Sequence, residues 1–176
     1  MKRILSFLTI ALGCTCISCN TTKTEGGLSA AAQKNLDAMH GVTHTFETKD
    51  FSKLGDFIAA DAVDHAGEKG DVKGLENMKA AFEKEAAGME NSKAEVIKEL
   101  ADDEYAMSWM RFTGSYAKEE MGHKAGEKYD MRSLEVAKFK DGKATEHWTM
   151  MEPGEMMKMM GGMKPPMPGA DSTKKM

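Results

Sequence analysis

Residues 133–152, SLEVAKFKDGKATEHWTMME, hold the pattern that decides the fold. Two stretches that suit β-strands flank the dipeptide Asp141-Gly142, with Lys140 and Lys143 on either side. Asp-Gly tolerates the positive φ angles of a type I′ turn, and the twist of that turn matches the twist of the strands beside it. The stretch therefore predicts a two-stranded antiparallel hairpin.

The second strand of this hairpin carries several polar and aromatic residues. Because successive side chains of a strand point to opposite faces, Glu146, Trp148 and Met150 share one face, and His147 and Thr149 share the other. Only one of these faces can line a pocket.

The hairpin resembles the last hairpin of the SnoaL-like branch of the nuclear transport factor 2-like superfamily, which commonly closes on the pattern F-x-D-G-K-I-x-E-H-W-D. The matching residues are Phe139, Asp141, Gly142, Lys143, Glu146, His147 and Trp148. The resemblance covers about residues 29–155. It implies an α+β fold in which a curved antiparallel sheet wraps around N-terminal helices, forming a cone with a pocket at its wide end. Because this fold hosts enzymes, binding modules and assembly domains, the resemblance leaves the function open.

Hydrophobic periodicity agrees with this fold class. Apolar residues at three- and four-residue steps predict a helix from about residue 28 to residue 46, with Ser29 as N-cap. They also predict a short helix after Asp50 that includes Ile58, and a third helix over residues 75–89. Strands are expected over residues 61–66, 92–100 and 105–116, and from residue 129. Helices that come early and strands that come late indicate an α+β domain.

Composition excludes several classes of function. The 176 residues allow one domain with appendages, and the formal net charge of −4 becomes about −6 without Lys2 and Arg3. An acidic chain without a basic patch argues against nucleic-acid binding. The three cysteines all precede residue 20, so the folded part offers no disulfide and no cysteine-based zinc site. Since neither a phosphate-binding glycine loop nor an HExxH motif is present, we predict no cofactor.

Residues 1–19 are predicted to be a lipoprotein signal peptide, followed by a polar tether over residues 20–28. A charged start precedes an apolar run that is too short to span a bilayer. The run ends in Cys-Ile-Ser-Cys-Asn, which resembles a bacterial lipobox, and we expect lipidation of Cys19. Cys14 and a plain secretory signal remain the alternatives. The prediction places the protein in the cell envelope, on the periplasmic or surface side of a bacterial membrane, held by its lipid anchor.

The first candidate for chemistry is His65, with Asp64 beside it. In ketosteroid isomerase-like relatives the general base lies near the end of the strand that follows the second helix, and His65 falls at about that place. Imidazole titrates near neutral pH and can move a proton. The alternative is a histidine at the rim that bonds to Asp61 or Asp64.

A second group of candidates lies on the long predicted strand. Alternation places Tyr105, Met107, Trp109 and Arg111 on one face. Arg111 would grip a negative group of a ligand, or else pair with Glu135 or Glu146. We expect this face and His65 to border one cavity between the concave side of the sheet and the first helix, with Met131 and Trp148 as further lining residues.

These residues favour binding of a small apolar or amphipathic molecule in the cone pocket. Many SnoaL-like sequences have an aspartate directly after the tryptophan, and Thr149 takes that position here. Because threonine cannot act as an acid or base near pH 7, the substitution disfavours cyclase activity. A proton-transfer enzyme that uses His65 (an isomerase, dehydratase or cyclase) is the alternative. An assembly module that forms a homodimer across the open sheet face is another.

The C-terminal stretch is rich in methionine. After Pro153 the composition shifts to Met, Gly and Pro, which predicts a flexible tail over residues 156–176. Thioethers suit Cu(I), so the tail is a candidate copper site through Met156, Met157, Met159, Met160 and Met163. The alternative is a low-complexity tail without a ligand.

Overall fold

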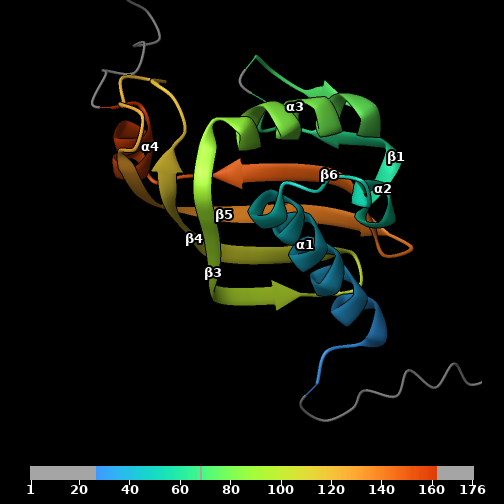
Figure 1. Ribbon diagram of the computed structural model, residues 1–176. Coiled ribbons are helices and arrows are strands. Elements are labelled where there is room, and N and C mark those ends of the chain that lie inside the picture. Colours follow the sequence, from blue (N-terminus) through green and yellow to red (C-terminus); the bar gives the residue numbers. More distant parts are fainter. Residues whose placement is uncertain (1–26, 68, 162–176) are drawn as a thin grey trace, which may run out of the picture.

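A computed structural model describes residues 27–67 and 69–161 (Figure 1). Within these residues the chain forms four helices and six strands. The helices are α1 (Ala30–Thr48), α2 (Leu54–Phe57), α3 (Leu75–Ala87) and α4 (Pro153–Met159). The strands are β1 (Ile58–Asp64), β2 (Val72–Lys73), β3 (Met89–Ala101), β4 (Tyr105–Tyr116), β5 (Lys128–Lys140) and β6 (Lys143–Met150).

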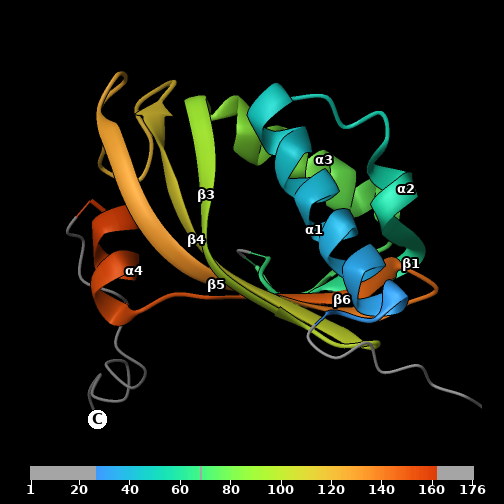
Figure 2. The same cartoon turned by 90° about the horizontal axis from the view of Figure 1, so that it is seen from below.

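The strands form one sheet in the order β2-β1-β6-β5-β4-β3. Consecutive strands from β3 to β6 pair antiparallel, and β1 pairs antiparallel with β2. The pair of β1 and β6 is parallel, so the sheet is mixed. The sheet curves strongly, and α1 and α3 lie in its hollow (Figure 2). The predicted α+β fold with a curved sheet around N-terminal helices is confirmed.

The hairpin of β5 and β6 forms as its sequence predicts. Lys140 pairs with Lys143, and both turn residues between them have positive φ, 56° at Asp141 and 77° at Gly142. The carbonyl of Asp141 accepts a hydrogen bond from Lys34 Nζ of α1 at 2.7 Å. The turn thereby ties the sheet to the first helix.

The first helix begins where the sequence predicts. The side chain of Ser29 accepts a hydrogen bond from the Ala32 backbone N–H at 3.0 Å, which satisfies one of the free donors of the first turn. The helix buries a stripe that includes Leu36 and Met39 against the sheet. The main core contains Leu36, Ala38, Met39, Phe51, Leu54, Ile58, Ala62, Met78, Phe82, Ala86, Ala106, Ala137, Phe139 and Ala144.

Three elements differ from the predicted ones, and one of them, β2, has no predicted counterpart. Ile58 belongs to β1 rather than to the second helix, because it pairs with Ala144 of β6 and is buried there. At the other end of the chain, α4 continues the packed structure past residue 155, where the sequence places the end of the domain, and Met159 packs against the aromatic residues of β4 and β5. Within residues 27–67 and 69–161, no helix combines the length and hydrophobicity that a membrane crossing requires.

Candidate functional site

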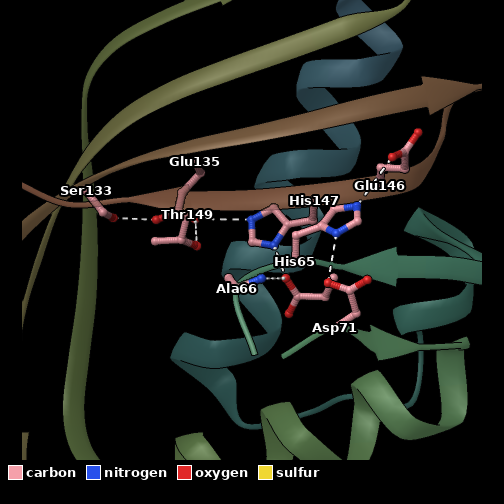
Figure 3. Close-up of polar contacts among 9 residues, drawn as sticks. His65, Ala66, Asp71, Ser133, Glu135, Glu146, His147 and Thr149 are labelled. Atoms are coloured by element: carbon pink, nitrogen blue, oxygen red, sulfur yellow. Dashed lines mark hydrogen bonds and ion pairs between the residues drawn. The ribbon is translucent and has the colours of Figure 1, made fainter. Parts of the chain in front are cut away.

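A polar network on the concave face of the sheet joins Asp64 of β1, His147 of β6 and Glu135 of β5 (Figure 3). His147 Nδ1 lies 3.0 Å from Asp64 Oδ1, and His147 Nε2 lies 3.1 Å from Glu135 Oε2. All three side chains are largely covered, with exposed fractions of 7% for Asp64, 15% for Glu135 and 24% for His147. The imidazole therefore lies between two carboxylates at the centre of the fold.

Strand register brings these residues together. Asp64 and His147 are partners in the parallel pair, and Glu135 faces Thr149 across the hairpin. Thr149 Oγ1 donates to Glu135 Oε2 at 2.6 Å, and the Ser133 hydroxyl donates to the other oxygen of the same carboxylate. These bonds leave no oxygen of Glu135 without a donor, as a buried carboxylate requires.

The two carboxylates keep His147 protonated on both nitrogens. Burial by itself lowers the pKa of His147, but the hydrogen bonds and charges of Asp64 and Glu135 outweigh burial and raise the pKa to about 9. Burial raises the pKa of each carboxyl, and the contacts with His147 more than offset this, so both pKa values lie below the ordinary range. At neutral pH the centre of the concave face thus holds a fixed imidazolium.

Glu85 faces this network from α3. It comes three residues after Phe82 and seven after Met78, which are buried, so it projects from the inward side of the helix. Its side chain stays open to water, yet desolvation and the negative charges of Glu135 and Asp64 raise its pKa. Glu135 and Glu85 are therefore two carboxyl groups whose environments push their pKa values in opposite directions, a pattern typical of acid–base pairs.

The concave face becomes aromatic toward the far ends of β4 and β5. Tyr116, Tyr129 and Met131 form a second buried cluster, and the hydroxyls of Tyr129 and Ser92 lie 2.8 Å apart. The negative charge of Glu85 contributes to the raised pKa of Tyr129, so Glu85 interacts electrostatically with this cluster as well as with the network of His147. Two surface hollows of about 420 and 340 Å³ lie at this end of the sheet, and Tyr129 lines both.

His65 lies on the other side of the sheet. Its ring stacks on Trp148, with centroids 4.9 Å apart and planes 16° apart. Nδ1 lies 3.1 Å from Asp71 Oδ1 and Nε2 lies 3.3 Å from Glu146 Oε2, and these contacts, the bond to Asp71 first, raise its pKa against the opposing effect of burial. The expectation that His65 borders a concave cavity is wrong, because Asp64 takes the inward position of β1 and the next residue must face outward. The expected rim contact exists, but with Asp71 and Glu146 rather than Asp61 or Asp64.

The predicted ligand face of β4 also points outward. Ala106, Ser108 and Met110 are buried, so the alternate residues that share a face with Tyr105 lie on the convex surface. That face carries Tyr105, Met107, Trp109 and Arg111, and Trp148 of β6 lies on it as well. Among the predicted ligand residues, only Met131 lies on the concave side. Their expected place in the cone is wrong for all except Met131, and a ligand-binding role for them stays a prediction.

Arg111 is paired on this outer surface. Its Nε and one terminal nitrogen donate to the Asp130 carboxylate at 2.8 and 2.7 Å, and a third contact reaches Glu95 at 3.5 Å. The partners therefore differ from the predicted Glu135 and Glu146, which are not its neighbours on the sheet.

The outer surface of the sheet also exposes large apolar side chains. Leu100 is 63% exposed and Met150 is 52% exposed, and Met107 and Trp109 lie open between them. Cross-strand pairing of Leu100 with Met107, of Trp109 with Leu134 and of Leu134 with Met150 makes these residues contiguous. We call this surface the outer apolar patch; it comprises Leu100, Met107, Trp109, Leu134, Trp148 and Met150.

Sequence and structural comparisons now place the chain in a family. A family profile described as SnoaL-like polyketide cyclase matches residues 37–158. The chain belongs to the SnoaL-like polyketide cyclase family. No curated protein matches it in sequence.

Solved structures with similar folds include the following three. TsrD from Streptomyces laurentii aligns with a TM-score of 0.64 at 19% identity, over 78% of this chain and 100% of its own. IdmH from Streptomyces antibioticus, assigned as a polyketide cyclase, aligns with a TM-score of 0.60 at 25% identity, over 72% and 98%. A SnoaL-like polyketide cyclase from Agrobacterium tumefaciens gives 0.61 at 14% identity, over 72% and 98%. These similarities support a SnoaL-like domain within the nuclear transport factor 2-like superfamily.

The methionines of this SnoaL-like chain do not share one environment. Met159 packs against Tyr116, Tyr129 and Met131, whereas Met156 and Met157 are exposed on α4 and Met160 is half-buried. Met163, Cys14 and Cys19 lie outside the described residues. In the described part of the chain, no cluster of three or more His, Cys, Asp or Glu side chains could hold a metal ion. Copper binding through methionine stays a prediction.

His147 belongs to the family pattern in the sequence, but that pattern assigns it no role. Alternation already separated it from Trp148, and that signal could have placed it on the concave face. Its partners Asp64 and Glu135 are 83 and 12 residues away, so only the strand register brings them to it. Glu85 carried no signal beyond its helical spacing from Met78 and Phe82.

Proposed function

We propose that the concave face binds a small amphipathic molecule that bears a carbonyl group and exchanges a proton with it. One observation carries this proposal: a fixed imidazolium at His147 lies near a carboxyl group, Glu85, whose pKa is raised. The aromatic cluster of Tyr116 and Tyr129 next to them suits the apolar part of such a molecule. The proton-transfer role thus moves from His65 to the inward-facing residues.

The chemistry divides between the two groups. The carboxylate of Glu85 takes a proton from the carbon next to the carbonyl, and the electron pair of that C–H bond moves to the carbonyl oxygen as an enolate forms. Since both N–H groups of His147 are bonded to carboxylates, the imidazolium stabilises the enolate through its charge. A carboxyl group with a raised pKa can then return the proton to the product.

This proposal fits the family. IdmH is assigned as a polyketide cyclase, and an aldol cyclisation starts from an enolate of this kind. The carboxylate that many SnoaL-like sequences place after the tryptophan is replaced here by Thr149. Glu135, directly across the hairpin and bonded to Thr149, supplies a carboxylate at nearly the same place.

The proposal is tested by deuterium exchange in heavy water. We expect the protein to accelerate exchange of the acidic C–H protons of aryl β-ketoesters, a simple amphipathic probe, and Glu85→Gln to abolish the acceleration. Glu83→Gln on the exposed side of the same helix is the matched control and should keep it. His65→Gln should keep it as well. Exchange that is unaffected by Glu85→Gln, or lost in His65→Gln, would overturn the proposal.

A second proposal concerns assembly. We propose that two copies of the domain form a homodimer through the outer apolar patch. The supporting observation is that Leu100, Met107, Trp109 and Met150 form an open apolar surface on a sheet whose other face is covered by helices.

The location in the cell rests on the sequence alone. We propose that the chain is exported and held at a bacterial membrane by a lipid on Cys19, because the charged start, the short apolar run and the lipobox-like Cys-Ile-Ser-Cys-Asn occur in the order that export requires. The concave site would then act on small molecules of the cell envelope.

A further inference from the structure

His123 joins the loop between β4 and β5 to the end of α4. Its Nε2 lies 2.9 Å from the carbonyl oxygen of Lys158 and 3.1 Å from that of Met159, and its Nδ1 lies 2.7 Å from Glu127 Oε1. The ring stacks on Tyr116, with centroids 4.3 Å apart and planes 8° apart. Only 9% of the residue is exposed.

These contacts require a proton on both ring nitrogens. The carbonyls of Lys158 and Met159 and the carboxylate of Glu127 are acceptors, so each nitrogen of His123 must donate. The last carbonyls of a helix lack partners within the helix, and a positive charge there interacts favourably with the helix dipole. His123 therefore acts as a charged cap supplied from another part of the chain.

We propose that doubly protonated His123 is a latch that fastens α4 to the edge of β5, and that loss of one ring proton releases α4. A neutral imidazole can donate from one nitrogen only, so it would lose either the carbonyls of α4 or the carboxylate of Glu127. Keeping the proton on Nδ1 preserves the bond to Glu127 and turns a lone pair of Nε2 toward the two carbonyls. The helix end is then repelled instead of bound.

The latch covers a specific part of the sheet. The part of β5 that precedes Leu134 has no partner in β6, and α4 lies beside it instead (Figure 1). Glu155 accepts a hydrogen bond from the Arg132 backbone N–H at 3.2 Å, and Met159 packs on the cluster of Tyr116, Tyr129 and Met131. The hollow of about 340 Å³ lies between this edge, His123 and Lys158. Release of α4 would open the aromatic end of the concave face, a consequence that rests on the proposed function.

The direction of the pH response follows from the groups around the ring. The hydrogen bond with Glu127 is the main cause that raises the pKa of His123, and the carbonyls of Lys158 and Met159 add to it against the opposing effect of burial. The pKa of Glu127 is lowered by the same contact, so Glu127 stays ionised at neutral pH. The latch is therefore closed at acidic pH and opens as the pH rises through the raised pKa of His123. The elements packed around the ring carry these charged or titratable groups: Glu120, Lys124 and Glu127 of the loop, Tyr116 of β4, Lys128, Tyr129 and Asp130 of β5, and Glu155 and Lys158 of α4.

Hydrogen exchange of the full-length protein tests the latch. After correction for the pH dependence of intrinsic exchange, amides of residues 155–161 should exchange about tenfold faster at pH 9 than at pH 6, since a charge-assisted hydrogen bond is lost. Peptides from α1 serve as the internal reference for global opening. His123→Gln, which keeps a donor but no charge, should exchange fast at both pH values. His44→Gln on the exposed side of α1 is the matched control and should behave as the wild type.

A second variant keeps the test decisive if His123→Gln does not fold. Glu127→Gln removes the charge that favours the imidazolium, so the pH at which α4 opens should fall. Its measurement is the ring titration of His123 by NMR together with the exchange of α4. Protection of α4 that is independent of pH in the wild type, or unchanged in both variants, would overturn the latch. Because neither readout needs a ligand, the result does not depend on whether the concave site is an enzyme.

Discussion

His147 of β6 donates from Nδ1 to Oδ1 of Asp64 of β1 at 3.0 Å, and the two residues are register partners in a parallel strand pair. The contact joins β6, the last strand in chain order, to β1, the first, and it fixes the orientation of the imidazole. Glu135 holds the opposite nitrogen, so the ring cannot turn without breaking a charged hydrogen bond. The stability of the fold and the proposed chemistry of the concave face therefore both depend on the protonated state of His147.

The protonation of His147 makes stability depend on pH. The pKa of His147 is raised in the folded state to about 9, so its contribution is fully present below the unfolded pKa and is lost as the pH rises through about 9. The shift is equivalent to about 3 kcal/mol of folding free energy at pH 6. We expect the urea concentration at the unfolding midpoint of the wild type to decrease as the pH is raised from 6.5 to about 9.5, as measured by circular dichroism.

His147→Gln provides the comparison. It should be less stable than the wild type at pH 6 and lose most of this pH dependence, because glutamine stays neutral. His44→Gln, on the exposed side of α1, should follow the wild-type curve. A wild-type midpoint that does not change over this range would show that folding does not raise the pKa of His147.

A second prediction concerns the contact between Thr149 and Glu135. Thr149→Asp restores the residue that many SnoaL-like sequences carry after the tryptophan, but here it places a carboxylate against Glu135, whose Oε2 now accepts from Thr149 at 2.6 Å. We expect a loss of about 1–3 kcal/mol at pH 7, since a donor is replaced by a like charge.

Two variants separate charge from shape at this position. Thr149→Asn has the size of aspartate without its charge and should be clearly more stable than Thr149→Asp. Combining Thr149→Asp with Glu135→Gln should recover stability, because only one carboxylate then remains at this position and the like-charge repulsion is removed. Equal stability of Thr149→Asp and Thr149→Asn in thermal unfolding would contradict the interpretation.

The outer apolar patch predicts a self-associating protein. Trp109→Lys should convert a dimer to a monomer in light scattering coupled to gel filtration, because a lysine cannot be buried without a partner at such an interface. Met157→Lys, an equally exposed apolar residue on α4, is the control and should stay dimeric. A wild type that is monomeric at all concentrations tested would remove the proposal.

Local signals in the sequence predict the fold better than they predict the site. The turn at Asp141-Gly142 and the cap at Ser29 depend on a few neighbouring residues, and both form as expected. Alternation on β4 divided the strand correctly into two faces, but hydrophobicity could not tell which face is inside. The bulky Trp109 faces out and the small Ala106 faces in, because α1 packs close to the sheet there. The network of His147 depends on the parallel pairing of β1 with β6, which no local pattern shows.

The lipid anchor is tested by cysteine substitution. Cys19→Ala should release the protein from the membrane fraction, because the polar tether has no apolar surface to hold it there. Cys14→Ala should leave it in that fraction. If Cys14→Ala is released and Cys19→Ala still sediments with membranes after a carbonate wash, the lipidated residue is Cys14.

Truncation after Pro153 measures what α4 contributes. Sequence reasoning predicts that the domain stays folded without residues 154–176. Truncation removes the packing of Met159 on Tyr116 and Tyr129 and the hydrogen bond of Glu155 with the Arg132 N–H. We therefore expect the truncated domain to be less stable by about 2–4 kcal/mol. A chain that ends after Gly161 keeps these contacts and is the matched control. If both truncations melt at the temperature of the full chain, α4 contributes nothing to the fold. If the shorter one loses its cooperative transition altogether, the domain extends to residue 161.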